Sequence, residues 1–181
     1  MEQEIITRQA TRADLDGIMR IETSCFGPDS FSKKQFVYLI TKAKGMFYVV
    51  EYQERIVAYV SLLQNDHTPN LRIYSLAVHP GFRKQKLGQH LIDKTIEFAR
   101  QHNHPKITLE VNVSNPAALR LYQKNKFEPV RTINNYYADG SNAYSMHLEV
   151  GYLEIFEAYP PPGAILIFSL RSAGTGMISF L

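Results

Sequence analysis

Hydrophobic and polar residues alternate most regularly between Ile107 and Val113, in the segment ITLEVNV. Every second residue of this segment is aliphatic, and the residues between them are Thr108, Glu110 and Asn112. Because successive side chains of a strand point to opposite faces, this pattern predicts a strand with one core face and one polar face. Glu110 is expected at the centre of the polar face.

The stretch 71–91, LRIYSLAVHPGFRKQKLGQHL, combines a strand pattern with a helix pattern. The apolar run that ends at Val78 predicts a buried strand, and the apolar spacing after Gly88 predicts a helix that ends near His102. Between them lies a basic loop, in which residues 83–86 read RKQK. Such a loop before a helix N-terminus offers a phosphate free backbone N–H groups and the positive end of a helix dipole. A solvated basic turn is the alternative that this stretch by itself leaves open.

Similar patterns predict the other elements of the chain. One helix is expected over residues 11–25, a second begins at the N-cap Ser32 and is closed by Gly45, and a third begins after Asn115. The remaining strands are expected at residues 5–10, 46–51, 56–63, 128–134 and 143–150, with a polar loop over 65–70. This order of elements predicts an α/β fold, or α+β in some schemes, around a mixed sheet.

Composition limits the possible classes of function. The chain has 181 residues, 45% of them hydrophobic and 20% charged, which predicts a single compact domain over residues 1–150. Its one cysteine, Cys25, excludes an internal disulfide framework and a cysteine-based zinc site, and no metal is expected. The acidic N-terminus lacks the apolar core of a signal peptide, so a cytoplasmic protein is expected. A net charge of +3 is too small to indicate nucleic-acid binding.

Residues 151–181 are expected to form a C-terminal extension and not a second domain. After the sequence YPPPG come the apolar segments AILIFSL and MISFL, a pattern that allows a hairpin covering a sheet edge or a partner subunit. The apolar run is too short to span a bilayer, and no membrane contact is expected. The protein is expected to be a monomer, or a homodimer that forms through this extension.

Two polar side chains are candidates for proton transfer. Glu110 is either an exposed strand residue or, if the polar face of its strand borders a cleft, a proton acceptor. Tyr122 lies seven residues after Asn115, two helical turns along nearly the same face. It is either an aromatic residue at the margin of the core or a phenol that donates a proton into the cleft.

These segments together resemble a known superfamily. LAVHPGFRKQKLGQHLI followed by LEVNVSNPAALRLYQKNKF is similar to the GNAT superfamily of acetyl-CoA-dependent N-acetyltransferases. With INNYYADGSNAYSMHL added, the chain resembles bacterial ribosomal-protein alanine N-acetyltransferases and their archaeal and eukaryotic N-terminal acetyltransferase relatives. The resemblance implies a mixed, mostly antiparallel sheet with helices on both faces and splayed central parallel strands. It also implies acetyl-CoA as cosubstrate and direct transfer without an acyl-enzyme.

The resemblance implies roles for three groups of residues. Glu110 matches the general base and Tyr122 the general acid. Residues matching the cofactor site are Leu76, Ala77 and Val78 for the pantetheine arm, Arg83, Lys84, Gln85, Lys86, Leu87, Gly88 and Gln89 for the pyrophosphate, and Asn115. Residues matching the peptide site are Phe26, Gly27, Pro28, Tyr136 and Tyr137. Lys86 stands where the family has the first glycine of its phosphate loop.

Three functions follow from these observations. The first is acetylation of a peptide or protein N-terminus, favoured by the loops at Phe26 and Tyr136. The second is acetylation of a small amine such as a polyamine or an aminoglycoside, which would favour a more acidic cleft. The third is a non-catalytic acyl-CoA sensor, or a nucleic-acid-binding module that uses the basic loop.

Overall fold

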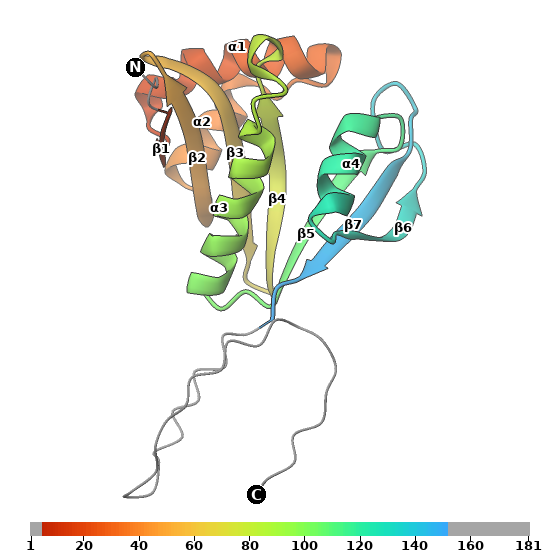
Figure 1. Ribbon diagram of the computed structural model, residues 1–181. Helices are drawn as coiled ribbons and strands as arrows, with labels where there is room; N and C mark the ends of the chain where they lie inside the picture. Colours follow the sequence, from red (N-terminus) through yellow and green to blue (C-terminus); the bar gives the residue numbers. More distant parts are fainter. Residues whose placement is uncertain (1–4, 152–181) are drawn as a thin grey trace, which may run out of the picture.

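The computed structural model describes residues 5–151, and the hairpin expected within the extension lies outside these residues. The strands are β1 (Ile5–Gln9), β2 (Gly45–Tyr52), β3 (Arg55–Asn65), β4 (Thr68–Val78), β5 (Lys106–Asn112), β6 (Glu128–Ile133) and β7 (Ala143–Glu149). The helices are α1 (Leu15–Phe26), α2 (Lys33–Thr41), α3 (Leu87–Gln101) and α4 (Pro116–Lys124). The strands form one sheet in the order β1-β2-β3-β4-β5-β7-β6 (Figure 1). No helix of this part of the chain is long and apolar enough to cross a membrane.

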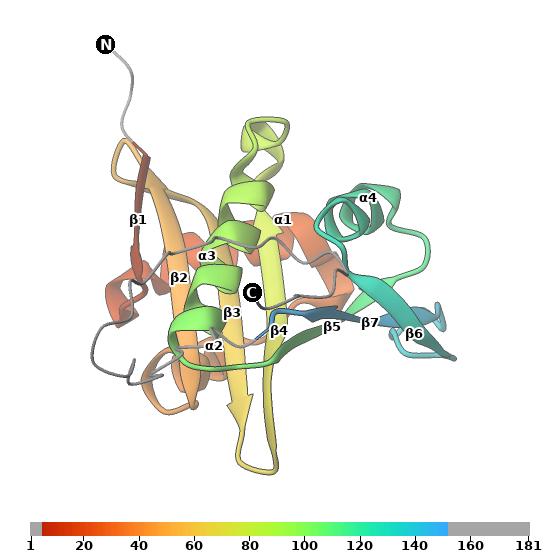
Figure 2. The ribbon, with the colours of Figure 1, turned by 60° about the horizontal axis from the view of Figure 1, so that its bottom comes forward.

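Helices cover both faces of the sheet, as the resemblance implied. The helices α1 and α2 lie against one face, and α3 and α4 lie on the other (Figures 1 and 2). Two buried clusters reflect this layering, one that includes Ile18, Phe36 and Tyr59, and one that includes Leu91 and Ile107. The alternation read in 107–113 is confirmed, because Ile107, Leu109 and Val111 are all buried in the second cluster.

One pair of neighbouring strands is parallel and separates along its length. Strand β4 pairs with β5 at Leu71 with Ile107 and at Arg72 with Thr108, while all other neighbouring strands are antiparallel. Beyond these two pairs β4 and β5 diverge, which leaves a wedge between them (Figure 1). The splayed parallel strands are thereby confirmed.

The prediction of a polar loop at residues 65–70 is wrong. Strand β3 extends to Asn65 and β4 begins at Thr68, so that Asp66 and His67 alone form the turn. The polar composition indicated a loop, but pairing of Gln64 with Leu71 continues the ladder into this segment. Tertiary pairing overrides the weak strand propensity of polar residues here.

Gly45 does not close the second helix. That helix ends at Thr41, and Gly45 is the first residue of β2 with φ 142°. A Cβ at this position would overlap the carbonyl oxygen of Leu62 on β3, so the glycine permits a close approach of two strands. The predicted N-cap of the same helix is confirmed, because the Ser32 hydroxyl accepts a hydrogen bond from the Gln35 N–H in a capping box.

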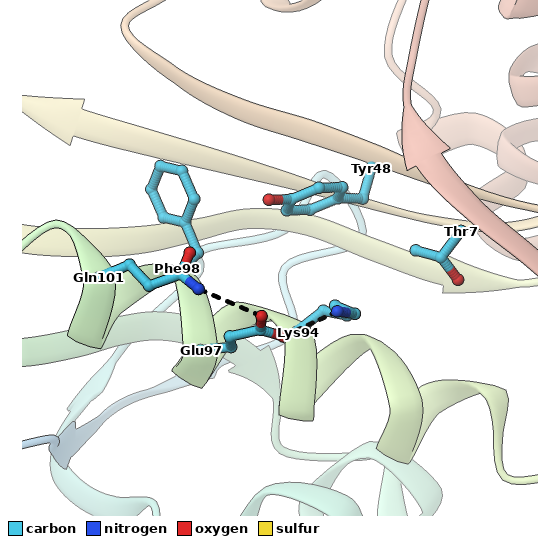
Figure 3. Close-up of a pocket in the computed structure, with 6 residues that line it drawn as sticks. All are labelled: Thr7, Tyr48, Lys94, Glu97, Phe98 and Gln101. Atoms are coloured by element: carbon cyan, nitrogen blue, oxygen red, sulfur yellow. Dashed lines mark hydrogen bonds and ion pairs between the residues drawn. The ribbon is translucent and has the colours of Figure 1, made fainter.

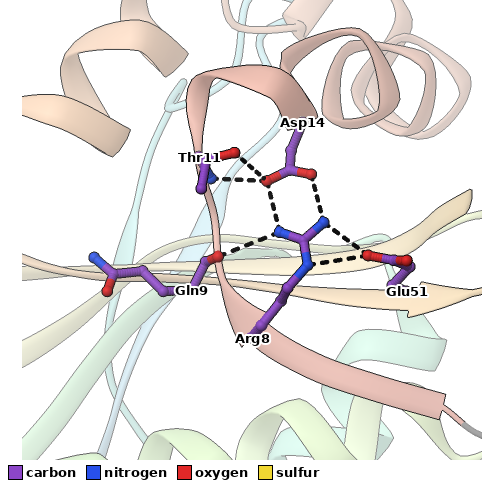
Figure 4. A network of polar contacts seen from close by, with 5 residues as sticks. All are labelled: Arg8, Gln9, Thr11, Asp14 and Glu51. Carbon is purple, nitrogen blue, oxygen red and sulfur yellow. Dashed lines mark hydrogen bonds and ion pairs between the residues drawn. The ribbon is translucent and has the colours of Figure 1, made fainter. Parts of the chain in front are cut away.

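An ion-pair network joins the first strand to the start of α1 (Figure 4). The Arg8 guanidinium donates to Asp14 at 2.7 and 2.8 Å and to Glu51 on β2 at 2.7 and 3.0 Å. The Asp14 carboxylate also accepts from the Thr11 N–H at 2.7 Å, so it caps the turn that precedes α1. The network therefore fixes the start of α1 against β1 and β2 at the edge of the sheet.

Candidate active site

A cavity of about 690 Å³ opens where β4 and β5 separate. Its lining includes Leu109 and Tyr122, which belong to the core under α3 and α4. The lining also includes Phe31 and Tyr74, which pack on the core under α1 and α2. The cavity therefore connects the two faces of the sheet through the gap between its parallel strands.

Seven of the residues expected in the site line this cavity. They are Phe26, Leu76, Glu110, Asn115, Tyr122, Tyr136 and Tyr137. The others lie outside the lining, namely Gly27, Pro28, Ala77, Val78 and the loop residues 83–89. Folding thus brings the expected proton-transfer residues and part of each binding group together around one space.

Glu110 stands on the polar face of β5 and points into the cavity region. Its side chain is 19% exposed, and its Oε2 accepts hydrogen bonds from Arg72 Nε at 3.0 Å and Arg72 Nη2 at 2.6 Å. The polar face of its strand does border a cleft, as the proton-acceptor interpretation requires. The arginine beside the carboxylate was not anticipated from the sequence.

Tyr122 is almost fully buried, at 7% exposure, and lines the cavity from α4. Its ring packs edge to face on Phe127 with centroids 5.5 Å apart. Burial raises the pKa of the Tyr122 hydroxyl well above its ordinary value. The phenol therefore remains protonated through the neutral and mildly alkaline range, which suits a proton donor.

A bulge shapes the end of β4 beside the cavity. Ser61 pairs with Ser75, but the next residue, Leu62, pairs with Ile73, so Tyr74 is an extra residue on β4. From Ser75 onward β4 pairs with β3 on one side, while its other edge no longer pairs with β5. The backbone of the last residues of β4 can therefore accept an extended ligand along that edge.

The basic loop has the geometry of an anion-binding turn. Lys84 and Lys86 both adopt left-handed backbone conformations, with φ of 63° and 61°. Lys86 is the N-cap of the fifteen-residue helix α3, and its side chain makes no capping hydrogen bond. The N–H groups of the first helical turn are therefore open to a phosphate, and the helix dipole favours one. The observed loop fits the pyrophosphate of a CoA thioester.

Two residues in the first turn of α3 also join it to α4. A Cβ at Gly88 would lie 3.1 Å from Leu121 Cδ2, so the glycine permits close helix packing. The Gln89 amide exchanges hydrogen bonds of 2.7 and 3.0 Å with the Asn125 amide. Gln89 is thus left with its backbone for an anion, while its side chain connects the two helices.

Asn115 is the N-cap of helix α4. Its Oδ1 accepts a hydrogen bond of 3.1 Å from the Ala118 N–H, which caps α4 as expected. The residue also lines the cavity, on the face that Tyr122 occupies two turns later. Its Nδ2 group is the part left for a ligand.

Aromatic residues form the opposite side of the cavity. Tyr136 and Tyr137 pack edge to face with centroids 5.1 Å apart, and Phe26 also lines the cavity. Burial, together with Tyr136 and the nearby carboxylates of Glu110 and Asp29, raises the pKa of Tyr137 to about 12. The Tyr137 hydroxyl therefore stays protonated at neutral pH.

Several lining residues were missed by the sequence analysis. Arg72, Tyr74 and Asp29 carry polar or aromatic groups into the cavity, and Glu22 adds a buried carboxyl to its lining. A signal for Arg72 was present, because it alternates with the apolar residues of its strand. Its proximity to Glu110 depends on the register between β4 and β5, which no single-sequence pattern specifies.

A second hollow, of about 80 Å³, lies between β2 and α3 (Figure 3). Its lining includes an exposed ion pair of 2.7 Å between Lys94 and Glu97, and Gln101 donates to Glu97 at 3.2 Å. It holds about the volume of a few water molecules. Within residues 5–151 no three His, Cys, Asp or Glu side chains gather as metal ligands.

A cavity that opens both faces of a sheet to one point suits an enzyme that transfers a group between two separately bound substrates. The model of the acetyltransferase (GNAT) family matches residues 15–127. The chain belongs to this family and is an acetyl-CoA-dependent N-acetyltransferase.

Similar proteins agree with this assignment. An N-alpha-acetyltransferase of Sulfolobus acidocaldarius is 33% identical over 150 residues, covering 77% of this chain and 89% of that protein. The putative [ribosomal protein bS18]-alanine N-acetyltransferase of Bacillus subtilis is 27% identical over 154 residues, covering 83% of this chain and 99% of that protein. The crystal structure of Ard1 from Thermoplasma volcanium superposes with a TM-score of 0.75 at 26% identity, covering 80% of this chain and 97% of that one.

Proposed function

We propose that this acetyltransferase acts on the free α-amino group of a peptide or protein N-terminus. The observation that carries the proposal is the cavity through the sheet, with Asn115 and Tyr122 lining it from α4 and Tyr136 and Tyr137 from the loop between β6 and β7. The donor enters from the α4 face and the acceptor from the face with the paired tyrosines. The relatives named N-alpha-acetyltransferase support an acceptor of this kind.

The donor side is assigned to acetyl-CoA through three features. The first turn of α3 and the left-handed Lys84 and Lys86 hold the pyrophosphate. The unpaired edge of β4 from Leu76 to Val78 binds the pantetheine arm by backbone hydrogen bonds. A backbone N–H of this edge also polarises the thioester carbonyl. Asn115 binds the cofactor further along.

The acceptor ammonium must lose a proton before it can attack the thioester. Glu110 accepts this proton, directly or through a water molecule, because its carboxylate lines the cavity on the acceptor side. The neutral amine then forms the amide bond as the carbon–sulfur bond breaks. Tyr122 donates its proton to the departing thiolate from the opposite face, and the second proton lost by the nitrogen as the amide forms returns to the Tyr122 oxygen through water.

Transfer proceeds without an acyl-enzyme. Cys25 is the one thiol of the chain and lines the cavity. Burial raises the pKa of the Cys25 thiol above its ordinary value, although Arg83 opposes this change. The thiol therefore stays protonated and is a poor nucleophile. Proximity of the two bound substrates supplies the rate advantage.

The experiment that tests the acceptor is acetylation of a peptide library that varies the first two residues. Each peptide is offered with a free and with a blocked N-terminus, beside lysine side chains and polyamines, and mass spectrometry locates the acetyl group. Tyr136→Ala and Tyr137→Ala are expected to raise KM for peptides about tenfold or more, as loss of an aromatic contact with the bound peptide does. Tyr38→Ala is the matched control, because Tyr38 is 56% exposed and lies on α2 outside the cavity lining.

Acetylation of free α-amines with loss in both cavity variants supports the proposal. Turnover of polyamines or aminoglycosides without turnover of peptides overturns the acceptor while the family assignment stands. Acetyl-CoA binding without turnover on any amine makes the chain a sensor.

A further inference from the structure

Arg72 lies beside Glu110 at the point where the parallel strands separate. It occupies the last pair between β4 and β5, opposite Thr108, and Glu110 stands two residues further along β5. Two of its donors, Nε and Nη2, converge on Oε2 of the carboxylate at 3.0 and 2.6 Å. No residue of 5–151 donates a hydrogen bond to the other oxygen, Oε1. One oxygen is therefore held and the other is left for a ligand.

The same guanidinium contacts the aromatic side of the cavity. Its Nη2 lies 3.4 Å from the hydroxyl oxygen of Tyr136, and its central carbon lies 5.4 Å from the centre of the Tyr74 ring. Tyr74 stacks on Phe31 with ring centroids 5.1 Å apart. Arg72 is thus the one described cation that connects the Glu110 carboxylate with the aromatic wall.

We propose that Arg72 is a positioning residue for acetyl transfer, which acts by orienting Glu110. Past Thr108 the two strands share no ladder hydrogen bonds, so no backbone contact fixes Glu110 relative to the end of β4. The ion pair supplies this link across the wedge, and it directs Oε1 to the acceptor ammonium. This inference rests on the proposed role of Glu110 as the proton acceptor.

The charge of Arg72 also matters before the acceptor arrives. Glu110 is 19% exposed and Arg72 38% exposed, so the pair is partly withdrawn from water. A carboxylate in such a position that loses its cation turns toward solvent or toward another donor. Lysine retains the charge but cannot place two rigidly spaced donors on one oxygen, so it replaces arginine only in part.

The test is a double-mutant cycle on turnover. Wild type, Arg72→Gln, Glu110→Gln and the double variant are compared with the amine that wild type acetylates fastest, whatever its class. Arg72→Gln is expected to lower kcat about tenfold in the wild-type background and less than about twofold when Glu110 is already glutamine, because contacting residues couple. Arg72→Lys is expected to recover part of the loss. Acetyl-CoA affinity is expected to stay unchanged in all four proteins.

A control variant tests whether loss of any surface cation lowers kcat. Lys44→Gln deletes an exposed cation that pairs with Asp66 at 2.6 Å, outside the cavity lining, and is expected to leave kcat unchanged. Thermal unfolding of each variant checks that the fold is retained.

The outcomes separate the two levels of the argument. Full activity of Glu110→Gln overturns the proposed base, and with it the positioning role. A strong loss in Glu110→Gln with additive loss in the double variant, or no loss in Arg72→Gln, overturns the role of Arg72 alone. Absence of peptide turnover overturns the acceptor but leaves the cycle measurable on another amine.

Discussion

The hydroxyl of Tyr59 donates a hydrogen bond to the carboxylate of Glu22 in the core below the cavity. Glu22 is 1% exposed, and its other oxygen accepts from the Phe31 N–H at 2.7 Å. Tyr59 also lies 3.1 Å from the Ser75 hydroxyl on β4. This buried network connects α1, the loop before α2 and the two central strands, so it supports the wall that Phe31 provides.

Glu22→Gln is expected to change how stability depends on pH. Burial raises the pKa of Glu22 above its ordinary value, and the hydrogen bonds from Tyr59 and Phe31 offset this in part. Because the folded state holds the proton more tightly than the unfolded state, the contribution of Glu22 to folding stability decreases as pH rises from the ordinary pKa through the raised pKa. The Tm of wild type minus that of the variant should therefore fall as pH rises above the ordinary glutamate pKa of about 4.3.

Glu97→Gln provides a control of opposite sign. The hydrogen bond and charge of Lys94 lower the pKa of Glu97, so its contribution is present above the ordinary value and is lost as pH falls. The residue is exposed, and the effect should be small. A difference in Tm for Glu22→Gln that does not vary with pH would contradict the raised pKa.

Tyr122→Phe is expected to lower kcat about 100-fold with unchanged acetyl-CoA affinity, a loss typical of a missing general acid. The phenylalanine retains the packing on Phe127, so the loss isolates the hydroxyl. Steady-state kinetics and titration calorimetry measure the two quantities. Tyr144→Phe, a tyrosine on β7 outside the cavity lining, should be silent. Equal kcat in both variants would remove Tyr122 from the mechanism.

Glu110→Gln is expected to lower kcat/KM mainly at neutral pH. A protonated amine cannot attack a thioester, so the base matters most where the acceptor is an ammonium ion. The α-amino group of a peptide has an ordinary pKa of about 8, and above it the defect should shrink. A pH series of kcat/KM from about 6 to 9.5 tests this, since that range brackets the amine. A defect of constant size across the series would contradict the proton-acceptor role.

Lys86→Gly is expected to stabilise the protein and Lys86→Ala is not. Lys86 holds φ 61° at the N-cap of α3, a conformation that costs a residue with a Cβ about 1 kcal/mol. Both substitutions remove the same positive charge, so comparing them isolates the Cβ. The Lys86→Gly variant is expected to bind acetyl-CoA more tightly than the Lys86→Ala variant, because a glycine at this position lets a phosphate approach the backbone. Thermal unfolding and calorimetric titration measure both effects.

Comparing the acetyl-CoA affinity of each variant with that of wild type shows what the lysine charge contributes. Tighter acetyl-CoA binding by Lys86→Gly than by wild type means that the lysine weakens cofactor binding. Weaker binding means that its ammonium has replaced the missing glycine. Identical behaviour of the glycine and alanine variants would contradict the importance of the backbone conformation.

Asp14→Asn is expected to destabilise the fold by about 0.5 to 2 kcal/mol, the range for a lost capping interaction. The hydrogen bond from Arg8 lowers the pKa of Asp14, so its contribution is present above the ordinary value and disappears as pH falls. Chemical denaturation at pH 7 and at low pH should show the difference shrink in acid. Asp16→Asn, which breaks an exposed pair with Lys33, is the matched control and should not change the midpoint. A similar midpoint for both variants would contradict the network's role.

The sequence by itself determined most of the local elements and, for the strand at 107–113, which side chains face the core. The alternation in 107–113 placed Glu110 on a polar face, and the Ser32 and Asn115 caps were read correctly, because periodicity and capping depend on neighbours along the chain. The basic loop before α3 could be predicted for the same reason. The family resemblance supplied the arrangement of these parts.

Only the tertiary structure decided which residues meet. The partnership of Arg72 with Glu110, the bulge at Tyr74 and the buried Glu22 network depend on strand register and on contacts distant in sequence. The left-handed Lys86 likewise shows a glycine-type backbone that its residue type conceals. Local patterns specify what each segment can form, whereas pairing between strands specifies which side chains share the cavity.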